Sequence, residues 1–465
     1  MAHHDLVVIG TGSGNSIADE RFSGWSVAIV ERATFGGTCL NVGCIPTKMY
    51  VHTADLAAGA RGSHRFGVDA EVESVRWRDI RDRIFGRIDP IAEAGRRYRE
   101  AADHVTVYAE RARFFGAKTL QLASGEQVSG DQIVIAAGSR PMIPDIAGLA
   151  DLQPDLVHTS DTVMRIDELP RSLAILGGGV VAAEMAHIFG GLGVAVTIVA
   201  RSQHLLRMED DDVAQRFTEI AQDRWRVRLS RVAHRAEPGA DGGVRLWLDD
   251  TLGQPDPDPV DADLLLVATG RVPNTDTLDV RRTGVSTHDD GRVVVDDYQR
   301  TVVPGVWALG DVSNPYQLKH LANAEARVVQ HNLLHPDDLV ASDHRYVPHA
   351  IFSSPQVASV GRTERDLRAT NTPYVVGSRP YSDVAYGWAM EDTTGFAKLI
   401  ADPRTGLLLG GHVIGPQAST VIQPVIQAMS FDQPAHEVAR GQYWIHPAMP
   451  EVIENALLSL PRPRP

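Results

Sequence analysis

The sequence predicts an α/β fold made of two similar parallel-sheet units, followed by a separate α+β domain. Apolar runs that fit buried strands recur along the chain, and each leads into a glycine turn and then a helical pattern. Two runs stand out, residues 5–9 and 173–176, because both enter a cluster of glycines. Their likeness indicates an internal duplication.

The third part of the chain has a different pattern of apolar residues. From about residue 346, apolar strand patterns at 397–400 and 407–414 alternate with helical patterns at 421–431 and 449–458. This mixture predicts an α+β domain. The Pro/Arg-rich segment 461–465 predicts a frayed tail.

Composition and charge exclude several classes of protein. The 465 residues exceed what one hydrophobic core holds, so several domains are expected. A net charge of −14 argues against nucleic acid as a partner, because that binding needs a basic surface. No apolar run approaches the roughly 20 residues that span a bilayer, and no signal peptide precedes the first strand. We therefore expect no membrane association and a cytoplasmic location.

The chain has only two cysteines, Cys39 and Cys44. A secreted disulfide scaffold would need more, and two ligands are too few for a structural zinc site. Closely spaced cysteines in a reducing compartment indicate redox chemistry, so no metal is expected.

The first glycine cluster fits a dinucleotide. Gly10 and Gly12 allow a tight turn and close approach of a pyrophosphate, and a following helix would supply N–H donors. Asn15 replaces the usual sixth small residue. Glu31, about 20 residues further on, follows the strand 27–30 and fits a ribose hydroxyl. Strand, turn and acid together predict a Rossmann-like unit.

The second cluster carries Gly177, Gly179 and Ala182 at the fingerprint positions. The strand 196–199 follows, and a site for NAD would place an acid directly after it. Ala200 stands there instead, with Arg201 next and Arg207 further on. Arginines bind a 2′-phosphate, so the second unit is predicted to take NADPH.

Cys39 and Cys44 follow two glycines and are expected in the first turns of a helix, where the dipole favours a thiolate. In a regular helix, five residues span about 140° and a rise of roughly 7.5 Å. A disulfide needs Cα atoms within about 7 Å, so the helix must be distorted between the cysteines. Gly43 permits the distortion, and Pro46 removes a helical hydrogen bond.

Five short motifs occur in a fixed order: residues 36–48, 136–138, 268–271, 309–311 and His446-Pro447 with Glu451. Together they resemble the pyridine nucleotide–disulfide oxidoreductases of the glutathione reductase and lipoamide dehydrogenase type, over essentially the whole chain. The resemblance implies FAD in the first unit and NADPH in the second. It also implies a homodimer, because the catalytic histidine of this family comes from the partner subunit.

The resemblance implies domain limits as well. The FAD-binding domain would comprise residues 1–147 and 275–345, the NADPH-binding domain 148–274, and the C-terminal dimerisation domain 346–465. The proline-rich segment 255–259 is then a hairpin loop within the second domain.

The resemblance assigns residues to each cofactor. FAD would be held by Gly10, Gly12, Ser13, Gly14, Glu31, Gly37, Thr38, Lys48, Ala137, Gly138 and Asp311. NADPH would be held by Gly177, Gly179, Val180, Ala182, Arg201, Arg207, Ala268 and Gly270. Val180 stands where relatives often place an aromatic lid over the flavin, so gating by a ring is not expected.

The catalytic roles follow from the same resemblance. Cys39 would attack the substrate disulfide, and Cys44 would face the flavin as a charge-transfer thiolate. His446 would be the acid–base, oriented by Glu451, because imidazole titrates near neutral pH.

The resemblance also places Lys48 and Glu184 beside the flavin, where they are expected to form an ion pair. A cation there would favour the reduced, anionic flavin electrostatically.

The substrate is predicted to be a small disulfide. Residues 383–390 and 442–447 resemble the branch of the family that reduces mycothione, which is a neutral, sugar-bearing disulfide. Glu20 stands where glutathione reductases place a basic residue, and Ser13 is a candidate substrate contact.

Several alternatives stay open. They are a lipoamide dehydrogenase that uses NAD, a glutathione-disulfide reductase and, more remotely, a flavin redox sensor without turnover. Mercuric reductase and the larger thioredoxin reductases are disfavoured, because the C-terminal segment has no cysteine.

Overall fold

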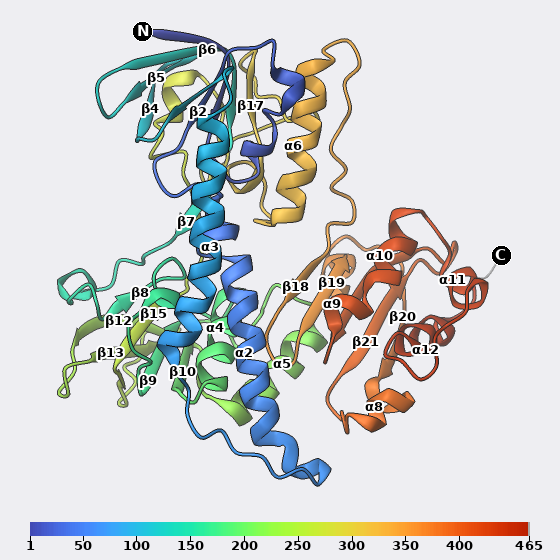
Figure 1. The fold of residues 1–465 in the computed structure, drawn as a ribbon. Helices are drawn as coiled ribbons and strands as arrows, with labels where there is room; N and C mark the ends of the chain where they lie inside the picture. Colours follow the sequence, from blue (N-terminus) through green and yellow to red (C-terminus); the bar gives the residue numbers. More distant parts are fainter. Residues whose placement is uncertain (464–465) are drawn as a thin grey trace.

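The computed structural model describes residues 1–463, which form three sheet-centred units (Figure 1). The first unit lies at the top of Figure 1, the second below it, and the C-terminal unit to the right. Residues 464–465 of the expected tail lie outside this description. No helix within residues 1–463 combines the length and apolar character needed to cross a membrane.

The first unit is built on a seven-stranded sheet with the order β3-β2-β1-β6-β5-β4, and β17 pairs with β6. Its central pairs are parallel, which explains why the second half of β1, Leu6–Ile9, and all of β2 are apolar and buried. The strands are β1 (Ala2–Ile9), β2 (Val27–Val30), β3 (Val105–Tyr108), β4 (Ala112–Gly116), β5 (Thr119–Leu122), β6 (Gln127–Ile135) and β17 (Val306–Ala308). Because β17 joins β6, the chain returns to the first sheet after completing the second.

The second unit has a parallel sheet with the order β11-β10-β9-β15-β8. The strands are β8 (Val157–His158), β9 (Ser172–Leu176), β10 (Ala195–Ala200), β11 (Arg226–Leu229) and β15 (Leu264–Val267). In both units a glycine cluster follows the middle strand, β1 or β9. This repeated arrangement confirms the α/β fold with two Rossmann-like units.

One small antiparallel sheet completes the second unit, and another joins the first two units. The segment 251–259 joins β13 (Val244–Asp250) to the antiparallel strand β14 (Val260–Ala262), as a hairpin loop would, and β12 (Arg231–Pro238) pairs with β13. Strands β7 (Ser139–Pro141) and β16 (Arg271–Pro273) pair where the chain passes between the first two units.

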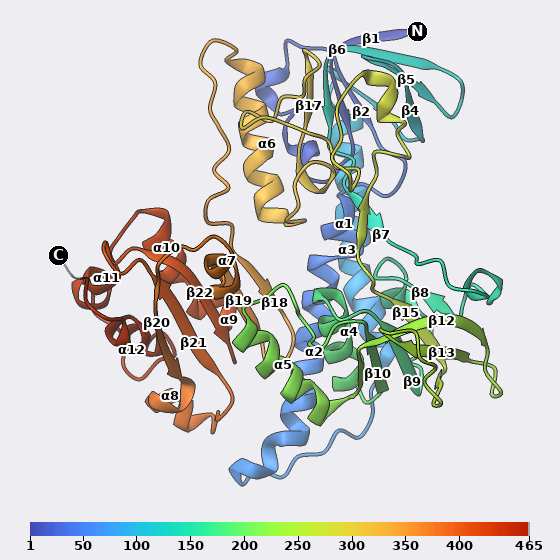
Figure 2. The ribbon, with the colours of Figure 1, turned by 180° about the vertical axis from the view of Figure 1, so that it is seen from behind.

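Three helices share one apolar core with the second sheet, and one of them, α3 (Trp77–Glu100), runs from the first unit down to the second (Figures 1 and 2). The other two are α2 (Cys44–Gly62) and α4 (Val180–Gly191). Tyr50 is fully buried, stacks on Trp77, and donates a hydrogen bond to the Met164 carbonyl. Since α2 begins at Cys44, this core fixes the base of the helix that carries the second cysteine.

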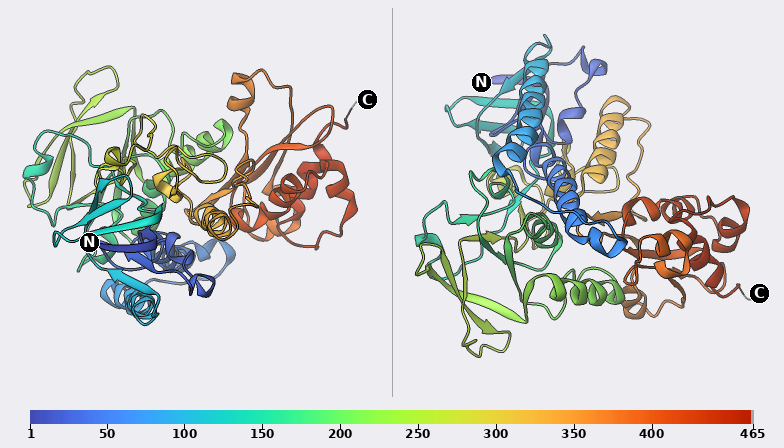
Figure 3. Two further views of the ribbon diagram at one scale, coloured as in Figure 1. Left: turned by 90° about the horizontal axis from the view of Figure 1, so that it is seen from above. Right: turned by 60° about the horizontal axis from the view of Figure 1, so that its bottom comes forward.

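The C-terminal unit has an antiparallel sheet with the order β18-β19-β22-β21-β20. Its strands are β18 (His349–Ile351), β19 (Val357–Gly361), β20 (Val375–Pro380), β21 (Phe396–Ala401) and β22 (Leu408–Ile414). Its helices are α7 (Glu364–Ala369), α8 (Ala385–Ala389), α9 (Ala418–Val421), α10 (Gln423–Ser430), α11 (Ala435–Gly441) and α12 (Glu451–Ser459). The views in Figure 3 place this unit to one side, with α5 (Asp211–Arg224) between it and the second sheet.

Two helix boundaries in the C-terminal unit differ from the predicted ones. The helix expected over 421–431 is two helices, α9 and α10, separated by Ile422, and Pro424 lies in the first turn of α10. The helix expected to begin at Met449 begins at Glu451, because Pro450 precedes its first turn.

Candidate functional site

The two cysteines lie at the junction of two helices. Cys39 belongs to α1 (Gly37–Asn41), and Cys44 opens α2. Between them Val42 and Gly43 leave the helical region, with φ/ψ of −144°/11° and −131°/−123°. A side chain at Gly43 would approach the Thr38 carbonyl oxygen to 3.0 Å. The predicted distortion between the cysteines is confirmed, and glycine is needed for it.

The thiol of Cys44 hydrogen-bonds the sulfur of Cys39, and this contact dominates the acidity of the pair. It lowers the pKa of Cys39 to about 7, helped by the charge of Lys319 and by the backbone N–H groups of Cys44 and Ile45. The same contact and burial raise the pKa of Cys44. Of the two sulfurs, Cys39 is therefore the better nucleophile near neutral pH.

Two adjoining pockets lead to the cysteines. The larger, about 390 Å³, is lined by Gly10, Gly12, Glu31, Gly37, Thr38, Ala137 and Gly138 among others. The smaller, about 120 Å³, is lined by Gly12, Ser13, Thr38, Cys39, Cys44, Gly138, Asp311 and Lys319 among others. Gly12, Thr38 and Gly138 line both, so one continuous channel joins the glycine cluster to the two sulfurs.

This channel fits an extended dinucleotide whose reactive end reaches the cysteines. A side chain at Gly37 would come within 2.6 Å of the Gly12 Cα, so glycine at position 37 is needed for the two segments to lie this close. Three hydrogen bonds fix the carboxylate of Glu31 at the end of β2. Its Oε2 accepts from the Thr11 N–H and hydroxyl, and its Oε1 accepts from the Ala33 N–H. Nine of the residues predicted to hold FAD line the channel; Gly14 and Lys48 do not. Gly14 instead packs on Ala136, where a side chain would clash.

The prediction of a helix directly after the first glycine cluster is wrong. The structure has only a 3₁₀ helix, Gly14–Ser16, and a second one, Glu20–Phe22. Side chains from elsewhere satisfy the carbonyls that a longer helix would use: Arg99 donates to Asn15 and Ala18, and Gln330 donates to Ile17. The predicted helix dipole therefore contributes little at this site.

Four polar residues that contact the predicted motifs were not themselves predicted as part of the site: Lys319, Asn323, Ser139 and Glu325. Ser13 donates to Asn323 (2.8 Å) and accepts from Lys319 (3.0 Å), while Ser139 donates to Asp311 (2.7 Å). Glu325, fully buried, accepts from the Gly310 N–H beside Asp311. Lys319, Asn323 and Glu325 all lie on α6 (Lys319–Leu334), about 300 residues from Ser13 in sequence, so no local pattern could reveal the contact.

The two glycine clusters repeat one backbone arrangement. Gly10 has φ of +104°, and a side chain there would lie 2.3 Å from the Ala136 carbonyl oxygen. Gly177 has φ of +134° and would meet the Ala268 carbonyl oxygen at 2.1 Å. The motifs 136–138 and 268–271 therefore lie directly behind the first glycine of each cluster, which accounts for their recurrence.

The second cluster opens α4 at its N-terminus. A side chain at Gly179, the N-cap, would meet nothing within 4 Å, and Val180 is 43% exposed. Arg201 follows β10 and Arg207 lies in the same loop. Both side chains are exposed, and within residues 1–463 neither guanidinium has an acidic partner. Both are thus available to an anionic group.

The ion pair expected between Lys48 and Glu184 is not formed among the described residues, so that prediction is wrong. The Lys48 ammonium lies 3.9 Å from the centroid of the Phe352 ring, and Glu184 accepts from the Phe352 N–H at 2.9 Å. Phe352 thus contacts both side chains, through its ring and its N–H. Burial raises the pKa of Glu184 to about 7 and lowers that of Lys48.

His446 and Glu451 are paired, but away from the cysteines. His446 Nδ1 lies 2.8 Å from Glu451 Oε1, and the Ala448 N–H donates to Oε2. The His446 side chain is 70% exposed, and neither residue lines the channel. Within one subunit, the described residues therefore bring together the sulfurs and the dinucleotide channel but not the imidazole.

Fold and site define a class of protein: a disulfide oxidoreductase with two dinucleotide sites and one cysteine pair. Sequence models agree with this definition. The model described as pyridine nucleotide-disulphide oxidoreductase matches residues 4–326, and the model of its dimerisation domain matches 347–457. The chain belongs to the pyridine nucleotide-disulphide oxidoreductase family.

Individual relatives are similar over their full length. Mycothione reductase of Mycobacterium tuberculosis H37Rv is 53% identical over 470 residues, covering 99% of this chain and 100% of the relative. Dihydrolipoyl dehydrogenase of Halobacterium salinarum is 30% identical over 466 residues, covering 97% and 95%. The solved Cu(II) complex of the HOCl-induced flavoprotein disulfide reductase RclA from Escherichia coli has a TM-score of 0.85 at 26% identity, covering 98% and 99%. The chain is a disulfide reductase, and family and relatives support FAD and NADPH as its cofactors.

Proposed function

We propose that this enzyme uses NADPH to reduce the disulfide mycothione to two molecules of mycothiol. The observation that carries the proposal is the cysteine pair, which lies across a helix break at the end of the dinucleotide channel. The 53% identity to a mycothione reductase supports the choice of disulfide. Bound FAD would accept hydride from NADPH and pass two electrons to the Cys39–Cys44 disulfide.

The substrate half of the reaction follows from the acidity of the sulfurs. The Cys39 thiolate attacks one sulfur of the substrate, a mixed disulfide forms, and the first thiol leaves as a thiolate. The Cys44 sulfur, once deprotonated, then attacks Cys39, releases the second thiol and restores the cysteine disulfide. Each departing thiolate takes up a proton, and the substrate gains two electrons and two protons.

We assign the role of proton donor to the departing thiolates to His446 of the partner subunit in a homodimer. Three features support this: His446 is paired with Glu451, it is exposed, and it lies away from the channel of its own subunit. Its neighbours Tyr443 and Ile445 are 103% and 77% exposed, which is unusual for such side chains and fits a surface covered by a second copy.

Two features support NADPH and a neutral disulfide. Arg201 and Arg207 are free to bind a 2′-phosphate, and Ala200 stands at the end of β10 where an acid would select NAD. Glu20 is exposed, and the adjacent Arg21 is held by Asp19 in a bidentate pair. The segment 19–21 therefore presents no unpaired guanidinium that could bind a carboxylate of glutathione. A cytoplasmic location is part of the proposal, since the cysteine pair must be reduced in every cycle.

The proposal is tested with a panel of disulfides: mycothione, glutathione disulfide and lipoamide, each with NADPH and with NADH. We expect kcat/KM to be highest with mycothione and NADPH. Preference for lipoamide with NADH would overturn the proposal in favour of a dihydrolipoyl dehydrogenase. Full reduction of the flavin without turnover of any disulfide would favour a redox sensor.

A further inference from the structure

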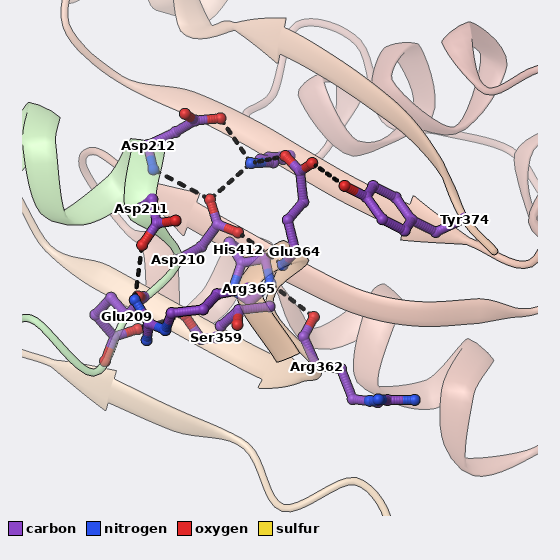
Figure 4. Close-up of polar contacts among 12 residues, drawn as sticks. Glu209, Asp210, Asp211, Asp212, Ser359, Arg362, Glu364, Arg365, Tyr374 and His412 are labelled. Atoms are coloured by element: carbon purple, nitrogen blue, oxygen red, sulfur yellow. Dashed lines mark hydrogen bonds and ion pairs between the residues drawn. The ribbon is translucent and has the colours of Figure 1, made fainter. Parts of the chain in front are cut away.

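A cluster of charged side chains joins the second unit to the C-terminal unit (Figure 4), and none of these side chains lines the channel to the cysteines. We call it the interdomain ionic network and define it as Glu209, Asp210, Asp212, His349, Ser359, Glu364, Arg365, Lys398 and His412. Glu209, Asp210 and Asp212 lie at or just before the start of α5, and the other members belong to the C-terminal unit. The proposed reaction makes no direct use of these residues.

One half of the network is centred on Lys398, whose side chain is 3% exposed. Its Nζ lies 2.7 Å from Asp210, 2.6 Å from Asp212 and 2.5 Å from Glu364. Asp210 also accepts from the Glu364 N–H and, as the N-cap of α5, from the Asp212 N–H. Removing one charge from such a buried group leaves its partners uncompensated, which is energetically costly. The arrangement of Lys398 and its three carboxylates is therefore strongly stabilised.

The other half is centred on Glu209, whose side chain is 4% exposed. It accepts from His349 (2.6 Å) and from the Ser359 hydroxyl (2.6 Å), and the buried His412 contacts Ser359 in turn. Burial opposes ionisation of Glu209, but the contacts with His349 and Ser359 and the charge of His412 together outweigh it and hold the pKa of the carboxyl below its usual value. The second half therefore also joins the two units through a charge.

The network reaches the loop that carries Arg207. Arg365 donates to the carbonyl oxygen of Arg207 (3.2 Å) and to that of Glu209 (3.5 Å), while its other nitrogen pairs with Asp211 (2.6 Å). At its other side the loop is fixed to the glycine cluster, because the Leu206 N–H donates to the Gly178 carbonyl at 2.7 Å. The backbone around Arg207 is thus held between the dinucleotide turn and the C-terminal unit.

We propose that the interdomain ionic network positions Arg207 for the 2′-phosphate and so contributes to the selection of NADPH over NADH. The inference rests on the proposed use of NADPH at Arg201 and Arg207. Arg365 and Glu209 are positioning residues here, since they act on the loop backbone and not on the cofactor. If the interdomain ionic network only joined the two domains, the hydrogen bond from Arg365 to the Arg207 carbonyl oxygen would not be required.

The test compares Arg365→Gln with Arg216→Gln in the FAD-loaded enzyme. Arg216 also crosses this boundary, donating to the Thr394 carbonyl at 2.7 Å, but it does not contact the loop. Both positions are partly exposed, so both variants are expected to fold. The probes are adenosine 2′,5′-bisphosphate and adenosine 5′-monophosphate, measured by calorimetry, together with KM for NADPH and NADH.

We expect Arg365→Gln to weaken binding of the bisphosphate and raise KM for NADPH by roughly three- to tenfold. Binding of the monophosphate, KM for NADH and kcat at saturating NADPH should not change, and Arg216→Gln should match wild type throughout. Glu209→Gln is the second variant, and it should act in the same direction because it weakens the contact with His349.

Three results would overturn the inference. The first is Arg365→Gln and Glu209→Gln both matching wild type, and the second is equal weakening of both probes. The third is a wild-type enzyme that binds the bisphosphate no more tightly than the monophosphate. Only this third result would also remove the proposed NADPH specificity, so the two failures are distinguishable.

Discussion

The ammonium group of Lys48 lies 3.9 Å from the centroid of the Phe352 ring and does not reach Glu184. The Phe352 N–H donates to Glu184, so one residue of the C-terminal unit contacts both charges. This arrangement leaves the half-buried Glu184 without an ion pair, and the charge of Lys48 lowers its pKa only in part. The acidity of Glu184 is therefore governed mainly by burial, which raises its pKa to about 7.

Glu184→Gln should stabilise the enzyme much more at pH 8 than at pH 5. The carboxyl ionises near 4.5 when unfolded and near 7 when folded, so the native state is penalised progressively as pH rises through that window. The full penalty above pH 7 is roughly 3 kcal/mol. Denaturant unfolding at both pH values measures it. Glu93→Gln, an exposed change on α3, should show no such difference, and a gain for Glu184→Gln at pH 5 equal to that at pH 8 would contradict the assignment.

Alkylation of the reduced enzyme by iodoacetamide should follow the titration of Cys39, with a midpoint near pH 7. Cys44→Ala should raise the midpoint most, because it removes the main contact that lowers the pKa of Cys39. Lys319→Gln should raise it less, and Lys118→Gln on the first sheet should leave it unchanged. Mass spectrometry of the modified peptide gives the profile. A midpoint unaffected by Cys44→Ala would show that the two sulfurs do not interact.

Subunits carrying Cys39→Ser and subunits carrying His446→Ala should each be inactive as homodimers but active when co-expressed. A mixed dimer pairs one intact cysteine pair with one intact imidazole, and random assortment restores about a quarter of the sites. Disulfide turnover per FAD of the co-expressed enzyme measures this. No recovery in verified mixed dimers would place His446 in its own subunit's site.

Gly177→Ala and Gly179→Ala should fail in different ways. At Gly177 the new methyl would meet the Ala268 carbonyl at 2.1 Å, so the variant should unfold at markedly lower temperature. At Gly179 nothing lies within 4 Å, so stability should be kept while KM for NADPH rises, since the methyl occupies space for the pyrophosphate. Thermal melting and kinetics separate the two. Equal loss of stability in both would contradict the distinction.

Arg201→Ala and Arg207→Ala should each raise KM for NADPH by roughly tenfold while KM for NADH stays near its wild-type value. Both guanidinium groups are exposed beside β10, where the 2′-phosphate is expected. Arg226→Ala on β11 is the control in the same unit and should change neither constant. Parallel increases for both cofactors would show that the arginines serve general dinucleotide binding.

Local sequence patterns predicted the elements whose stability is local. The apolar runs gave β2 with its observed ends and β9 and β10 within one residue, since buried parallel strands are continuously apolar. The helix after Gly14 was predicted wrongly. Its carbonyls are satisfied by Arg99 and Gln330, which are distant in sequence and replace the helical hydrogen bonds.

The sequence by itself determined the two cysteines, the glycine clusters and the break between Cys39 and Cys44, because backbone sterics act within a few residues. Only the tertiary structure decided which distant side chains meet there. It placed Phe352 in contact with both Lys48 and Glu184, Lys319 beside Cys39, and Arg365 against the backbone of Arg207. These contacts depend on how separate units pack, and packing energy is summed over many residues that no short pattern contains.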